Sequence, residues 1–179
     1  MRQNWQMWSG RFDANFVSTV SDLAGNVQNA ETFNNAGDDI RKSKVAWLSN
    51  SDYLLTTLFD FVDFSNRSAF NFSIYKKADI QYTEYHGSEG GHYSWHHDVD
   101  WNRDDGLDRK LSVVVQLSDP SDYEGGEFSF GETENPNQDE FKKLGSILIF
   151  PSYLQHSVSP VTSGIRKSLV AWFEGPTWR

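Results

Sequence analysis

The sequence predicts a mainly β protein with flanking helices, in which two β-sheets stack as a sandwich or jelly roll. Apolar residues recur at helical spacing in the first third of the chain. From Phe70 onward, short apolar or alternating runs are separated by Gly, Pro, Asn and Asp. Helices followed by many strands favour this α+β arrangement over alternating βα units. We expect one domain over residues 1–179, with N-terminal helices over about 13–64 and a β core over about 70–175.

Two helices are expected in the N-terminal third. Asp13 is placed to cap the first, and Ser51 or Asp52 to cap the second, because short polar side chains accept hydrogen bonds from the free amides of a first helical turn. The apolar positions at helical spacing are Phe16, Val20, Leu23, Ala24 and Val27 in the first segment, and Leu54, Leu55, Leu58, Phe59 and Val62 in the second.

Seven later runs have the length and composition of β-strands. They are FNFSIY (70–75), DIQYTEY (79–85), HYSWHHDV (92–99), KLSVVVQL (110–117), GEFSF (126–130), SILIF (146–150) and KSLVAWF (167–173). Gly125 and Gly126 predict a tight turn or bulge between strands. Residues 131–140 form an acidic stretch with Asn and Pro, which is expected to be a loop and is a candidate lid.

Charge and composition narrow the classes of function. Because 16 Lys and Arg stand against 25 Asp and Glu, the net charge of −9 opposes nucleic-acid binding. Small molecules, peptides or proteins are the expected partners of a monomer or weak homo-oligomer. Without Cys, any metal is held by His, Asp or Glu. No apolar run is long enough for a signal-peptide core or a membrane span, so a cytoplasmic location is expected.

The distribution of histidines suggests a metal site. Four of the five lie within twelve positions and one lies apart: His86, His92, His96, His97 and His156. On a strand, His96 and Asp98 face one side and His97 the other. Together with His156, they make the two-His, one-carboxylate set of non-haem Fe(II) oxygenases, which leaves coordination positions open for a keto acid and O2. A His-x-Asp tripeptide is also common in solvated turns, so a non-catalytic β-sandwich module holding zinc stays open as an alternative.

A cationic residue follows the late histidine at a suggestive distance. Pro160 and Gly164 mark a turn between His156 and Arg166, which predicts a hairpin with these two residues on adjoining strands about 5 Å apart. The planar guanidinium of Arg pairs well with a carboxylate. We therefore expect Arg166 to bind a ligand carboxylate in the pocket of the metal, with a surface ion pair as the alternative.

Four stretches carry a resemblance to a known family. They are QYTEY, GGHYSWHHDVDW, RKLSVVVQLSDPSDYEGGEFSF and GSILIFPSYLQHSVSPVTSGIRKSLVAWFEGP, and together they cover most of the β-rich region. The chain resembles the Fe(II)/2-oxoglutarate-dependent dioxygenases of the prolyl 4-hydroxylase type, nearest to the PKHD-type hydroxylases of bacteria and viruses. The resemblance implies a double-stranded β-helix core that is jelly-roll and cupin-like. It also implies Fe(II), the cosubstrates 2-oxoglutarate and O2, and ascorbate as an additional reductant.

The resemblance also implies roles for individual residues. It carries the iron ligands onto His96, Asp98 and His156, and the contact with the far carboxylate of 2-oxoglutarate onto Arg166, where animal and plant prolyl hydroxylases usually have Lys. The further implied cosubstrate contacts are Tyr85 and Ser112, and the residues implied to flank the substrate are Tyr93 and Trp172. A plain inward-facing strand serine and core aromatic packing are the respective alternatives for Ser112 and for the Tyr93 and Trp172 pair.

The implied reaction is hydroxylation of an unactivated C–H bond with release of succinate and CO2. Family members that halogenate have a small residue at the position of Asp98, so its presence favours hydroxylation. A prolyl residue in a peptide or protein is the favoured substrate. The alternative within the same chemistry is a free amino acid or another small molecule.

Three further groups of residues near the ligand stretch have weaker expectations. The other histidines are expected in a lid, beside the site or at the surface: His86, His92 and His97. Basic residues before the VAWL run are expected on a solvated strand face, with contact to an acidic cosubstrate or peptide as the alternative: Arg41, Lys42 and Lys44. Two tryptophans bracket the ligand stretch and are expected either to shield the iron or to be simply buried: Trp95 and Trp101.

Overall fold

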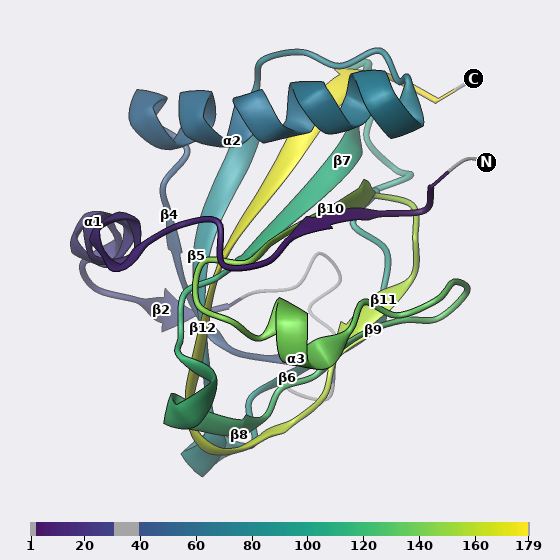
Figure 1. Cartoon of the computed structure of the whole chain (residues 1–179). Coiled ribbons are helices and arrows are strands. Elements are labelled where there is room, and N and C mark those ends of the chain that lie inside the picture. The colour runs from purple at the N-terminus through teal and green to yellow at the C-terminus, as the bar shows by residue number, and fades with distance from the viewer. Residues whose placement is uncertain (1–2, 31–39, 179) are drawn as a thin grey trace.

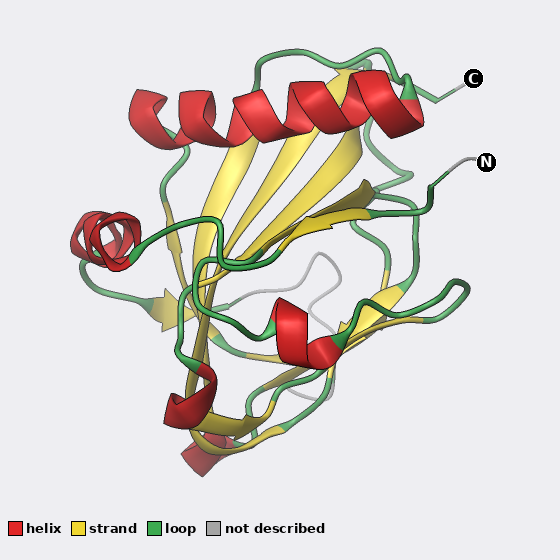
Figure 2. Ribbon diagram, in the orientation of Figure 1, coloured by secondary structure: helices red, strands yellow, loops and turns green. Residues whose placement is uncertain are grey.

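Two antiparallel β-sheets make up the fold in the computed structural model, which describes residues 3–30 and 40–178 (Figures 1 and 2). The major sheet has the order β1-β10-β7-β12-β5-β4-β2, and β8 pairs with the beginning of β12. The minor sheet has the order β3-β6-β11-β9. The predicted mainly β, jelly-roll architecture is therefore confirmed.

Strands range from two-residue bridges to a 16-residue element, β12. Their bounds are β1 Gln6–Trp8, β2 Gln28–Asn29, β3 Arg41–Lys42, β4 Lys44–Trp47, β5 Ala78–His86, β6 His92–His96, β7 Leu107–Gln116, β8 Tyr123–Gly125, β9 Phe128–Phe130, β10 Ile147–Pro151, β11 His156–Val158 and β12 Val161–Pro176. Six of the seven predicted runs contribute to these strands. The strands outside these seven runs have four residues or fewer, too few to show a periodic pattern: β1, β2, β3, β4, β8 and β11.

Both predicted helices form where their caps indicate. The Asp13 side chain accepts a hydrogen bond from the Phe16 amide (3.0 Å) at the start of α1 (Ala14–Ala24), and Ser51 accepts one from Leu54 (3.3 Å) at the start of α2 (Asp52–Ser65). α1 ends earlier than the apolar pattern suggests, because Gly25 has a φ of 54° and turns the chain before Val27. Figure 1 shows α2 lying across one face of the major sheet.

The predicted strand at 70–75 is wrong. α2 continues into a π-helical turn over Asn66–Phe70, and Asn71 then adopts a left-handed conformation. The Asn66 amide side chain bonds both the amide (2.7 Å) and the carbonyl (2.8 Å) of Phe72, so these backbone groups need no neighbouring strand. The alternating apolar side chains of this segment instead pack against the core beneath the helices.

Two apolar clusters lie on the two faces of the major sheet. One cluster packs α1 and α2 against the face of the major sheet that points away from the minor sheet, through residues such as Val20, Leu58 and Val113. The other, with Phe128, Phe150 and residues of both sheets, fills the space between the sheets. Successive residues of β7 and β12 therefore pack into different clusters, because neighbouring side chains on a strand point to opposite faces.

The predicted hairpin between His156 and Arg166 is wrong as well. β11 pairs with β6 and β9 in the minor sheet, whereas β12 pairs with β5, β7 and β8. Both edges of β11 are occupied, so residues Ser159 and Pro160 carry the chain from one sheet to the other. His156 and Arg166 still line one cavity, because they face each other from the two sheets.

The loop predicted at 131–140 contains a short helix, α3 (Gln138–Phe141), capped by the Asn137 side chain. Within the described residues, no helix has the length and apolar character needed to cross a membrane.

Candidate metal centre

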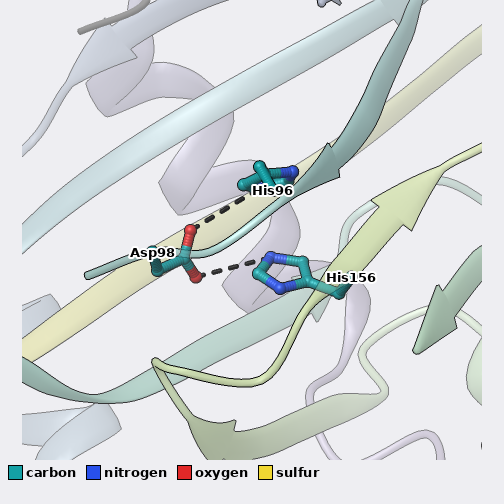
Figure 3. A group of neighbouring side chains, drawn as sticks. All are labelled: His96, Asp98 and His156. Carbon is teal, nitrogen blue, oxygen red and sulfur yellow. Dashed lines mark ion pairs between the residues drawn. The ribbon is translucent and has the colours of Figure 1, made fainter. Parts of the chain in front are cut away.

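His96, Asp98 and His156 come together at one end of the minor sheet. His96 is the last residue of β6, Asp98 follows it by two positions, and His156 opens β11 in register with His96. One ligand atom from each residue lies within 4.8 Å of the others. The Asp98 carboxylate lies 3.6 Å from His96 Nε2 and 3.4 Å from His156 Nε2 (Figure 3).

Hydrogen bonds set the tautomer of both imidazoles. His96 Nδ1 lies 2.7 Å from the Ser94 carbonyl, and His156 Nδ1 lies 2.9 Å from the Leu154 carbonyl. A carbonyl oxygen only accepts, so in each ring Nδ1 carries the proton and donates. The lone pair of each Nε2 is thereby left for a metal, in the arrangement by which backbone carbonyls commonly orient metal-binding histidines.

The Asp98 carboxylate is held by serines. Ser112 Oγ donates to Asp98 Oδ2 (2.6 Å) and lies 2.9 Å from Ser152 Oγ, while the Asp98 amide donates to the Ser152 carbonyl (3.0 Å). Ser112 is thus fully buried behind the carboxylate and is not among the residues that line the cavity. The structure places its hydroxyl on a candidate metal ligand.

The protonation states suit a metal ligand set. Burial lowers the pKa of His156 to about 4, so its imidazole is neutral at pH 7. Burial by itself would raise the pKa of Asp98, but His156, His96 and the Ser112 hydroxyl together bring it below its usual range. A neutral imidazole and an ionised carboxylate are the forms that bind metal ions, so no proton has to leave these two groups first.

Aromatic rings fix the two imidazoles further. Tyr93 stacks on His96 with ring centres 3.4 Å apart, and His156 lies between Phe128 and Phe150 at 5.4 and 4.8 Å. Burial raises the pKa of Tyr93 to about 12, so its phenol stays protonated. The ligand rings therefore have little freedom to turn.

A cavity lies beside the triad, between the two sheets. Its lining includes all three triad residues and four of the other residues singled out from the sequence: Tyr85, Tyr93, Arg166 and Trp172. It also includes Gln81, which sequence reasoning missed, and Arg41, for which contact with an acidic cosubstrate or peptide was the alternative expectation.

Arg166 is buried in this cavity with part of its guanidinium unpaired. Its side chain is 1% exposed, and Nε and Nη2 have no hydrogen-bond partner among the described residues. The guanidinium carbon lies 5.5 Å from the Tyr85 ring, and Tyr85 is its register partner on β5. Gly126, with a φ of 61°, leaves room for it, because a Cβ there would lie 2.7 Å from Arg166 Cδ.

Several expectations for the surroundings are corrected. Trp95 and Trp101 are 51% and 63% exposed, so they are not buried, and neither lines the cavity beside the triad. Arg41 is 8% exposed and does not lie on a solvated strand face, because its side chain turns inward between the sheets.

The other histidines lie outside the triad. His86 Nε2 bonds Glu84 (2.8 Å), His92 Nδ1 bonds the Gly90 carbonyl (2.9 Å), and the exposed His97 bonds the Tyr153 carbonyl (2.8 Å). The expected alternation of His97 away from His96 and Asp98 agrees with this placement.

A jelly-roll core that carries two histidines and one carboxylate beside an open cavity has the architecture of a non-haem iron oxygenase. Residues 80–174, just over half of the chain, match the model of the 2OG-Fe(II) oxygenase superfamily. The chain therefore belongs to this family, and its relatives are of the PKHD type.

The curated relatives and solved structures agree with this assignment. A PKHD-type hydroxylase of Prochlorococcus marinus is 31% identical over 135 residues, covering 75% of this chain and 56% of the relative. The chain spans at most a little over half the length of the first curated relatives that it matches.

Two solved structures share the fold. A Pseudomonas putida prolyl-4-hydroxylase has a TM-score of 0.72 at 19% identity, covering 97% of this chain and 94% of the other. A Trichoplax adhaerens prolyl hydroxylase in complex with a hypoxia inducible factor peptide fragment has a TM-score of 0.74 at 20% identity, covering 95% and 83%.

Proposed function

We propose that this chain is an Fe(II)- and 2-oxoglutarate-dependent oxygenase in which His96, Asp98 and His156 hold the iron. The observation that carries the proposal is the convergence of two Nε2 atoms and one carboxylate within 4.8 Å, beside an open cavity. Two imidazoles and a carboxylate are the ligand set that non-haem Fe(II) oxygenases use. The donors present therefore fit Fe(II).

We further propose that Arg166 binds the far carboxylate of 2-oxoglutarate, with Tyr85 beside it. A buried guanidinium whose Nε and Nη2 lack partners is costly unless a ligand supplies an anion. A dicarboxylic keto acid supplies one carboxylate to Arg166 and leaves the keto acid end for the metal. Family membership supports this cosubstrate independently.

When bound, Fe(II), 2-oxoglutarate and O2 supply an oxidation that releases succinate and CO2 and places one oxygen atom on a C–H carbon, with ascorbate as an additional reductant. The protein's own contribution is orientation. Ser112 keeps Asp98 in place, and the backbone carbonyls of Ser94 and Leu154 aim the two imidazoles. Tyr93 and Trp172 line the cavity beside the triad, and in this proposal they flank the substrate.

For the substrate, we propose a prolyl residue in a peptide or protein. This rests on the PKHD-type relatives and on the prolyl hydroxylases that share the fold, one of which holds a peptide fragment. The same chemistry on free proline is the alternative that the assay must separate. In this proposal, helices over about 13–64 support the β core of one oxygenase domain.

The test is turnover by the purified chain with Fe(II), 2-oxoglutarate and O2. Succinate formation and O2 consumption are measured with a proline-rich peptide and with free proline, and mass spectrometry follows the gain of one oxygen atom. His96→Ala, Asp98→Ala and His156→Ala should each abolish turnover. His97→Ala is the matched control, because His97 is exposed and bonds a carbonyl away from the triad. Tight zinc binding without any O2 consumption would instead support a non-catalytic module.

A further inference from the structure

A second guanidinium lines the cavity in addition to Arg166. Arg41 lies on β3, where it is the register partner of Tyr93, but its side chain crosses to the major sheet. Nη2 donates to Gln81 Oε1 on β5 and Nε donates to Ser43 Oγ, both at 2.8 Å. The side chain is only 8% exposed, so Arg41 is a cation held between the two sheets.

No carboxylate within the described parts of the chain forms an ion pair with Arg41. Both of its hydrogen-bond acceptors are neutral oxygens, and Nη1 makes no hydrogen bond to any described residue. The ring of Tyr93, 4.7 Å from the guanidinium carbon, adds a cation–π contact but no negative charge. A buried cation without an anionic partner has a high desolvation cost, so this side of the cavity favours an anion.

The net charge of the site with Fe(II) and 2-oxoglutarate bound also favours an additional anion. Fe(II) and the dianion of 2-oxoglutarate cancel, and Asp98 offsets one of the two lining arginines. His156 is neutral. One positive charge is therefore left unbalanced between two buried arginine side chains, where charges interact more strongly than at the surface.

Arg41 and Arg166 contact different positions along β5. Arg166 pairs with Tyr85 on β5, whereas Arg41 bonds Gln81, four residues away along the same strand. At the rise of an extended strand, the Cα atoms of these two β5 residues are about 13 Å apart. An anion at Arg41 is instead next to Tyr93, whose other contact is the stacked ring of His96. This places the anion beside the metal, where the reacting molecule has to lie.

We infer that the substrate carries a carboxylate that pairs with Arg41, close to the carbon that is hydroxylated. The inference rests on the proposed function and adds a charge requirement to it. A carboxylate in this position has three sources: a free amino acid such as proline, the C-terminal carboxylate of a peptide that ends in proline, or an acidic side chain next to the prolyl residue. Arg41 is then a specificity-determining residue for all three.

The experiment compares matched acids and amides. The probes are proline and prolinamide, a proline-terminated tripeptide as the free acid and the amide, and a blocked peptide with Pro-Glu or Pro-Gln. Their dissociation constants are measured by calorimetry on protein loaded with Zn(II) and 2-oxoglutarate, which binds without turnover. We expect at least one acid to bind about 10- to 100-fold more tightly than its amide, the range of a charge-assisted hydrogen bond. The pair that shows the preference identifies the source.

Three variants decide whether Arg41 is the cause. Arg41→Met should reduce the preference to less than about threefold, and Arg41→Lys should restore part of it because the charge returns. Gln81→Glu should also remove the preference, since it places a carboxylate next to Nη2 and neutralises Arg41 without deleting it. If Arg41→Met does not fold, Gln81→Glu tests whether the charge of Arg41 causes the preference. Arg67→Met, which removes an exposed charge paired with Asp63 on α2, should keep the full preference.

Two results would overturn the inference: equal affinity for acid and amide in every pair, or a preference that survives Arg41→Met or Gln81→Glu. Succinate formation by the Fe(II) form is measured separately. Absence of turnover would contradict the proposed function, whereas the binding preference is decided with the zinc form and does not depend on turnover.

Discussion

His96 and His156 are direct cross-strand neighbours, paired in register between β6 and β11 with ring centres 4.2 Å apart. Each ring donates Nδ1–H to a carbonyl two residues earlier in its own segment. The two halves of the candidate metal centre are thus built in the same way. Each ligand is oriented by its own strand, and strand pairing brings the two together.

Ser112→Ala should weaken metal binding by about 10- to 100-fold, because residues that orient a metal ligand typically contribute this much. Its hydroxyl bonds Asp98 Oδ2 and is buried away from the cavity. The measurement is an Fe(II) or Zn(II) titration, followed by a 2-oxoglutarate titration at saturating metal. A large loss of 2-oxoglutarate affinity with unchanged metal affinity would instead support a direct cosubstrate contact.

Arg166→Ala should weaken 2-oxoglutarate binding by about 2–5 kcal/mol, the cost of truncating one partner of a buried charged pair. Arg166→Lys should retain part of the affinity, because it keeps the charge but loses the planar fork. Calorimetric titration with 2-oxoglutarate checks both variants. An unchanged dissociation constant in Arg166→Ala would reject the assignment of this residue.

Gly126→Ala should impair 2-oxoglutarate binding indirectly. The new Cβ would lie 2.7 Å from Arg166 Cδ and 3.0 Å from Val161 Cγ2, so the guanidinium must shift. Gly90→Ala is the matched control, because Gly90 has a similar φ of 64° but nothing within 4 Å of a new Cβ.

Both glycine variants should lose about 1–2 kcal/mol of stability from the left-handed backbone. Only Gly126→Ala should also lose 2-oxoglutarate affinity. Thermal unfolding and ligand titration separate the two effects, and equal ligand affinity in both variants would show that Arg166 tolerates the added methyl group.

The metal-free protein should lose stability as the pH falls from about 6.5 to about 4. Burial lowers the pKa of His156 in the folded state to about 4, so in this window the unfolded chain takes up a proton that the folded chain does not. The free energy of unfolding therefore falls by about 1.4 kcal/mol per pH unit for this one proton. Asp98, whose pKa is also lowered in the folded state, adds to the loss below its usual range.

Urea unfolding between pH 7 and 4 in the presence of a chelator measures this dependence. His156→Gln should make the slope shallower by about one proton. His97→Gln removes an exposed imidazole and serves as the control. A slope that is the same in His156→Gln and in the unmodified chain would contradict a neutral, buried His156.

Much of the local structure follows from the sequence. The caps at Asp13 and Ser51, the strand runs around Val113 and Ile149, and the turn at Gly125 depend on interactions within a few residues, which periodicity and side-chain chemistry report directly. The spacing of His96 and Asp98 likewise places them together without knowledge of any distant segment.

Only the tertiary structure decided how distant segments pair. The hairpin expected around Pro160 does not form, because β6 and β9 occupy both edges of β11, and no local pattern reveals that competition. The run at 70–75 alternates like a strand, yet the Asn66 side chain bonds the amide and the carbonyl of Phe72 in the middle of it.

The same limit applies to buried polar groups. Composition places Arg41 at the surface and leaves Ser112 ambiguous, but packing of the two sheets turns the first into the cavity and the second behind Asp98. The sequence by itself determined most of the elements and the candidate metal ligands, because these depend on short-range geometry. The tertiary structure decided which charges lie inside, because burial depends on every segment that packs around them.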